Sequence, residues 1–134
     1  MAAGKYSFVI EQGTTVNFEI QYKDSNSNPI DLTGYDGRMQ IASNYASDPT
    51  RTVYLTLSSS LNADGTGLNF SGSNGTTPLT SGSIGIYIAA CTSSALTFNT
   101  AYYDLEIYSG SAGCPVTTRL LEGQIRLSQQ VTTI

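Results

Sequence analysis

Side-chain oxygens alternate along Asp24-Ser-Asn26-Ser-Asn28, which is the spacing of the first ligands in a calcium-binding loop. The match ends there. An EF-hand loop needs Gly at its sixth position and a bidentate Glu at its twelfth, where this chain has Pro29 and Tyr35. We therefore expect a hairpin-type loop here, and we predict no metal site and no cofactor in the chain.

Asp104 and Glu106 are the carboxylates best placed to act as an acid and base pair, as in glycosidases. They are two positions apart in an expected strand, so they project from the same face about 7 Å apart. Tyr102 and Tyr108 share that face. Because one adjacent pair without a pocket indicates little chemistry, a solvated or contact-facing strand is the favoured interpretation.

Nucleophilic catalysis lacks its usual partners. The chain has no His, the side chain that most often transfers protons near neutral pH and binds metals. A Ser nucleophile would need Lys5 or Lys23 as its base, and no Gly pattern typical of a phosphate-binding turn is present. We predict that the chain has no catalytic residues and is not an enzyme.

The two cysteines, Cys91 and Cys114, are too few for a secreted disulfide scaffold and lack the spacing of a metal site. Cys91 ends an expected strand over 84–90, and Cys114 follows the next one, over 102–108. A strand of seven residues is about 23 Å long, whereas a disulfide allows at most about 7 Å between Cα atoms. An intrachain bridge is therefore disfavoured, which leaves free thiols or bonds between chains.

Charge is scarce in this chain of 134 residues. Only 12% of the residues are charged, the net charge is −4, and no cluster of Lys and Arg is present, which argues against nucleic-acid binding. The first residues lack the apolar run of a secretory signal, and no stretch approaches the about 20 apolar residues of a membrane span. We expect a soluble protein without a membrane partner.

The elements that carry these residues are strands, because apolar and polar residues alternate with period two along most of the chain. The alternating runs cover 16–22, 38–41, 53–57, 84–88, 102–108, 116–127 and 131–134, and turn-forming residues separate them. The nearest helix candidate, 41–47, would make at most one or two turns. The sequence predicts one domain, residues 1–134, with an all-β fold: an antiparallel immunoglobulin-like β-sandwich of seven or eight strands.

Tyrosine is the unusual residue of this composition, with nine copies and no Trp. Tyr combines apolar area with a hydroxyl that tolerates water, and it is enriched at protein interfaces and sugar-binding surfaces. Outward Tyr can also reflect β propensity alone. The solvent-facing phase of the runs and the final run give the interface residues that we predict: Tyr45, Tyr54, Tyr87, Tyr102, Tyr108, Val131 and Ile134.

Two stretches, taken in order, resemble known proteins. The first includes 13–24, then Asn-Pro-Ile-Asp-Leu-Thr-Gly-Tyr at 28–35, then 38–41; the second includes 103–108 and 117–129. Together they cover about half of the chain and resemble the small immunoglobulin-like virion proteins of tailed bacteriophages, including the N-terminal domain of phage baseplate upper proteins. The segment 28–35 is the most distinctive, since Asp31 can accept a bond from a nearby backbone amide and Gly34 can adopt positive φ.

The resemblance implies a structural component of the virion, in the tail, baseplate or neck, made in the host cytoplasm. It carries over no catalytic residue. The expected partners are other virion structural proteins and further copies of the chain, in a homo-oligomer, with the run 131–134 adding to a neighbouring sheet edge. The alternative is a carbohydrate-binding module for host-surface attachment, which would use Tyr and Asn on a sheet face or in the loops 62–80 to hold a host glycan.

Overall fold

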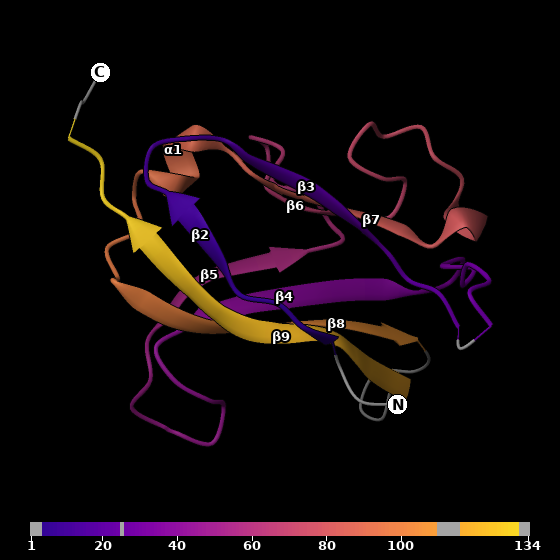
Figure 1. The fold of residues 1–134 in the computed structure, drawn as a ribbon, viewed down its shortest axis with the longest axis horizontal. Coiled ribbons are helices and arrows are strands. Elements are labelled where there is room, and N and C mark those ends of the chain that lie inside the picture. The colour runs from indigo at the N-terminus through magenta and orange to yellow at the C-terminus, as the bar shows by residue number, and fades with distance from the viewer. Residues whose placement is uncertain (1–3, 25, 110–115, 132–134) are drawn as a thin grey trace.

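The structure, a computed structural model, describes residues 4–24, 26–109 and 116–131. Within these residues, nine strands form two sheets that pack face to face (Figure 1). The strands are β1 (Gly4–Lys5), β2 (Phe8–Glu11), β3 (Val16–Gln21), β4 (Asp36–Ala42), β5 (Val53–Ser58), β6 (Gly67–Asn69), β7 (Ser83–Ile88), β8 (Thr100–Ser109) and β9 (Val116–Ser128). A 3-10 turn η1 (Leu79–Ser81) and a single helical turn α1 (Ala90–Ser93) complete the elements.

The strand order is that of an immunoglobulin-like sandwich. The larger sheet, sheet A, has the order β1-β9-β8-β4-β5 with β2 also paired to β9, and the smaller sheet, sheet B, has the order β3-β7-β6. With β3 to β9 taken as strands B, C, C′, D, E, F and G, these are the G-F-C-C′ and B-E-D sheets of that fold. The predicted immunoglobulin-like β-sandwich is confirmed, but the described residues form nine strands where seven or eight were predicted. The pairings are antiparallel except those of β1 and β2 with β9, which are parallel.

The core lies between the inner faces of the two sheets. Met39, Ile41, Leu105 and Ile107 point inward from sheet A, and sheet B contributes alternate residues of β7 (Ile84, Ile86 and Ile88). All of these side chains are buried. The period-two alternation of the sequence therefore sorts each strand into a core face and a solvent face, and the solvent face of sheet A carries the candidate site.

The distinctive segment 28–35 has the expected geometry. The backbone N–H of Thr33 donates to Asp31 Oδ1 at 2.9 Å, Gly34 has a φ of 83°, and Leu32 is buried in the core. The hairpin-type loop before it is also confirmed, because the backbone N–H groups of Asn26 and Asn28 donate to Asp24 Oδ1. The Asp24 carboxylate, the first oxygen of the calcium-like pattern, thus serves the loop itself.

Three predictions about local structure were wrong. Helical turns occur at η1 and α1 and not at 41–47, so Cys91 lies in α1 and does not end a strand. The strands β1, β2 and β6 were missed, because each has at most four residues and shows little alternation. Tyr54 does not face solvent: the register shifts between Ile41 and Ala42, which turns the Tyr54 ring toward Phe98 with the centroids 4.8 Å apart. That bulge leaves Val53 exposed instead.

Candidate functional site

Polar and charged side chains gather on the outer face of sheet A because strand register aligns them. Arg38 of β4 lies opposite Glu106 of β8, and Glu106 lies opposite Arg119 of β9. The next outward row contains Gln40, Asp104 and Glu122 on the same three strands. Neighbouring strands are about 4.8 Å apart, so these side chains reach one another without leaving the sheet face.

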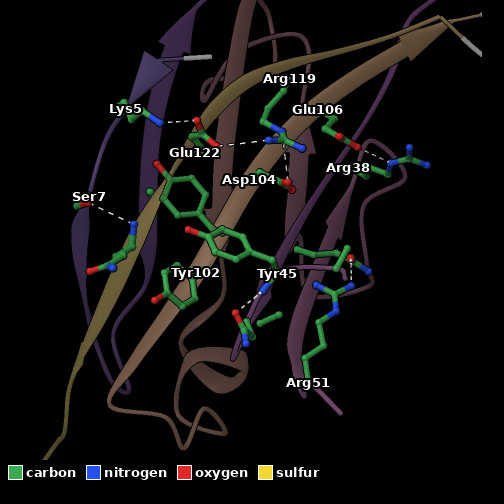
Figure 2. A pocket seen from close by; sticks show the side chains of 17 residues that line it. Lys5, Ser7, Arg38, Tyr45, Arg51, Tyr102, Asp104, Glu106, Arg119 and Glu122 are labelled. Atoms are coloured by element: carbon green, nitrogen blue, oxygen red, sulfur yellow. Dashed lines mark hydrogen bonds and ion pairs between the residues drawn. The ribbon is translucent and has the colours of Figure 1, made fainter. Parts of the chain in front are cut away.

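Ion pairs link most of these groups (Figure 2). Lys5 Nζ lies 2.7 Å from Glu122 Oε1, and Arg119 joins Glu122 to Asp104, with its Nη1 3.4 Å from Glu122 Oε2 and its Nε 3.5 Å from Asp104 Oδ2. A separate pair connects Arg38 Nε to Glu106 Oε1 at 3.1 Å, and the Arg38 guanidinium lies over the Tyr108 ring. Lys5 and its hydrogen bond lower the pKa of Glu122.

The connection between β4 and β5 adds aromatic and cationic groups at one end of this face. Tyr45 is 65% exposed, and its ring centroid lies 5.0 Å from that of Tyr102 on β8. Asn44 and Asp48 fix the loop, since Asn44 Nδ2 donates to Asp48 Oδ2 and the backbone N–H of Tyr45 donates to Asn44 Oδ1. Arg51 donates to Gln40 Oε1 and forms no ion pair within 4.0 Å among the described residues.

These groups surround an open hollow of about 590 Å³, which we call the sheet A hollow. Its side chains include four cations (Lys5, Arg38, Arg51 and Arg119), three carboxylates (Asp104, Glu106 and Glu122), two tyrosine rings (Tyr45 and Tyr102) and the small Ala42 and Ala46. Three of the four arginines of a chain with little charge therefore lie around one hollow. Burial, and then the neighbouring Glu106, raise the pKa of Asp104, while Arg119 opposes them.

The predicted interface residues are divided between the two sheets. Tyr45, Tyr102 and Tyr108 lie on the outer side of sheet A, whereas Tyr87 lies on the outer face of sheet B, opposite Asn17 of β3. Tyr54 packs against the core, as described above. Val131 is 97% exposed just beyond β9, and Ile134 lies outside the described residues.

Tyr87 lines a second hollow, of about 250 Å³, which we call the sheet B hollow. The polar groups around it include Asn17, Asp64, Asn69 and Ser73, and Gly65 lies against the Tyr87 ring. Asp64 is already bonded within the chain, because it accepts hydrogen bonds from the Thr92 hydroxyl at 2.6 Å and from the backbone N–H of Thr66 at 2.9 Å. These bonds lower the pKa of Asp64 to about 2.

The sequence prediction identified part of the sheet A hollow and missed the rest. It placed Tyr102, Asp104, Glu106 and Tyr108 on one face, as the structure has them. The sequence prediction did not place Lys5 and Arg51 on that face. The scarcity of charged residues was a signal that each Arg has a specific position. The approach of Lys5 and Arg51 depends on the parallel pairing of β1 with β9 and on the course of the 43–52 loop.

The cysteine and the carboxylates of the described residues show no arrangement typical of a metal site. No group of three or more His, Cys, Asp or Glu side chains within the described part of the chain is placed to hold a metal ion. Cys91 is exposed, with Sγ 3.6 Å from Asp64 Oδ2. Cys114 lies outside the described residues, so the predicted absence of an intrachain bridge stays a prediction. Across residues 4–24, 26–109 and 116–131, no helix has the length and apolar character needed to span a membrane.

Comparison with known proteins adds little to this geometry. No family model matches the chain, and neither does any curated protein. Among solved structures, a chicken TCR is similar, with a TM-score of 0.48 and 14% sequence identity over 94% of this chain and 54% of that chain. The chain thus spans about half the length of that structure, and a similarity this distant carries no information about function.

Proposed function

We propose that the chain is a non-enzymatic structural component of a tailed-phage particle and that it acts through contacts with other protein chains. The sequence resemblance to immunoglobulin-like virion proteins supports the virion, and the tail, baseplate or neck is the part of the particle that it favours. The confirmed fold is compatible with this function. The observation that carries the contact function is the free edge of sheet A.

That edge is β5, the last strand in the order β1-β9-β8-β4-β5. Soluble proteins usually protect such an edge with Lys, Pro or an inward charge, because its unpaired backbone groups accept strands from other chains. β5 has the sequence Val-Tyr-Leu-Thr-Leu-Ser, without a charge or a Pro, and Val53 is 41% exposed. At its Ser58 end the chain itself comes close, since Gly67 lies against the Ser58 carbonyl.

A strand from a neighbouring subunit fits this edge. Backbone hydrogen bonds would supply affinity, and the exposed Val53 and Thr56 would supply side-chain contact. The low charge of the chain reduces the cost of desolvating such a contact, since unpaired buried charges cost several kcal/mol each. The β5 edge is therefore the surface where we place the contact between subunits.

Mass spectrometry of purified particles of the phage that encodes the chain tests this function. We expect the chain in a fixed ratio to the major coat protein, and its absence from the particles would reject the proposal. In the same assay, Thr56→Lys should reduce incorporation at least about tenfold, because a charge on the edge opposes strand addition. Thr100→Lys, the same change at an exposed position of the interior strand β8, should leave incorporation unchanged.

A further inference from the structure

We propose that the sheet A hollow is a binding site for a neutral hexopyranose residue of a glycan. This inference goes beyond the proposed contact function, which uses the β5 edge and does not require the hollow to bind a ligand. It rests on the shape of the hollow, its aromatic side, and the unused hydrogen-bonding capacity of Asp104 and Arg51 (Figure 2).

The shape and the aromatic side suit a sugar ring. A volume of about 590 Å³ lies within the about 300–1,000 Å³ range of small-molecule sites. The residues that line it include the Tyr45 and Tyr102 rings, which lie 33° from parallel. A pyranose has one face of C–H groups that packs against such rings, while its hydroxyls point sideways.

The polar side offers both kinds of hydrogen-bonding group. Asp104 is half-buried, yet within the described residues it accepts no hydrogen bond, and its Arg119 partner lies at 3.5 Å. Carboxylates in such positions normally accept several bonds, so Asp104 has acceptor capacity left for ligand hydroxyls. Arg51, which donates to Gln40, has further N–H groups for ligand oxygens. A pair of neighbouring hydroxyls presents both a donor and an acceptor.

The charges that line the hollow largely cancel, so they give an ionic ligand little advantage over a neutral one. Four cations face three carboxylates, and Lys5, Arg38 and Arg119 are each already paired with a carboxylate. An acidic ligand would meet Asp104 and Glu106, and a cationic ligand would meet Arg51 and Arg119. A neutral polyol avoids both repulsions and satisfies both kinds of group.

The test is titration of the purified chain with methyl glycosides of glucose, galactose, mannose and N-acetylglucosamine, followed by backbone amide shifts in NMR. At least one sugar should shift amides at 42–46 and 102–104 saturably, with a dissociation constant on the order of 1 mM. Binding should change less than about twofold when salt is raised, because neither ligand nor site relies on a long-range charge. Tyr102→Ala should weaken binding roughly tenfold, and Asp104→Asn roughly fivefold.

Tyr87→Ala is the matched control, since it removes an outward Tyr from the other sheet and should leave the affinity unchanged. The proposal is rejected if no sugar gives saturable shifts, or if Tyr87→Ala weakens binding as much as Tyr102→Ala. It is also rejected if sodium acetate shifts the same amides as strongly as the sugars, because the hollow would then be an anion site. Incorporation into particles without sugar binding would reject this inference and leave the contact function intact.

Discussion

The two outward hollows each contain an aspartate, and the two aspartates are held in opposite ways. Asp64, in the sheet B hollow, is solvated and accepts bonds from Thr92 and Thr66, which lower its pKa to about 2. Asp104, in the sheet A hollow, is half-buried beside Glu106, and its pKa is raised. The Asp64 carboxylate stabilises its own loop, whereas burial and the nearby Glu106 disfavour the ionised form of Asp104. Because Asp104 also accepts no hydrogen bond within the described residues, it is the better candidate to bind a ligand.

The same contrast extends to what covers each sheet. Part of the outer face of sheet B, beside the sheet B hollow, is covered by the 71–77 loop: the backbone of Gly72 and Ser73 lies directly over Gly85, and Glu19 accepts hydrogen bonds from the Ser73 backbone and hydroxyl. The outer face of sheet A keeps an open hollow of about 590 Å³. The 71–77 loop is therefore held on sheet B by the chain's own contacts, and the larger of the two hollows lies on sheet A.

The largest expected effect tests the covered face. A Cβ at Gly85 would lie 2.7 Å from the Ser73 backbone N and 2.8 Å from the Gly72 carbonyl carbon, so Gly85→Val must displace the 71–77 loop. Overpacking of this kind costs about 1–3 kcal/mol, measured as a lower free energy of unfolding in urea. Gly4→Ala is the control, because a Cβ there meets a flexible Leu121 side chain at 3.2 Å. Equal stability of the two variants would show that the loop does not cover sheet B.

The sequence predicts which residues face outward on sheets A and B only where local alternation within one strand decides the side-chain direction. Alternation along 102–108 correctly placed Tyr102, Asp104, Glu106 and Tyr108 outward, because side-chain direction in a strand follows from local parity. The alternation gave the wrong direction for Tyr54, because one extra residue in the pairing of β5 with β4 reverses which residues face outward. The pair Lys5 and Glu122 joins residues 117 positions apart through the two-residue strand β1, which no local pattern indicates.

The second expected effect is on the pH dependence of stability. The lowered pKa of Asp64 means that its ionised form is favoured in the folded state, so its contribution is present above about pH 3.8 and is lost as the pH falls through about 2. Asp64→Asn should therefore show a smaller loss of melting temperature than the parent protein between these two pH values. Asp104→Asn should not reduce that loss, because the raised pKa of Asp104 favours the protonated form in the folded state. If both variants lose stability as the parent does, the contrast between the two aspartates is wrong.

The smallest expected effect on stability comes from Glu106→Gln, and it sharpens the account of the sheet A hollow. The change removes the ion pair with Arg38, whose side chain is half-exposed, and exposed pairs contribute only about 0–1 kcal/mol. It also removes the repulsion between Glu106 and Asp104, so the two effects oppose each other and the free energy of unfolding should change by less than about 0.5 kcal/mol.

The pKa of Asp104, followed by NMR of its side-chain carboxyl carbon, should nevertheless fall toward its ordinary value in Glu106→Gln, because Glu106 is one of the groups that raise it. Glu19→Gln, on the outer face of sheet B, is the control and should leave that pKa unchanged. A large loss of stability without a change in the Asp104 pKa would make the charged groups of sheet A structural supports. In that case Asp104 would not be available to bind a ligand. The outer faces of sheets A and B would then differ only in how many charged groups they carry.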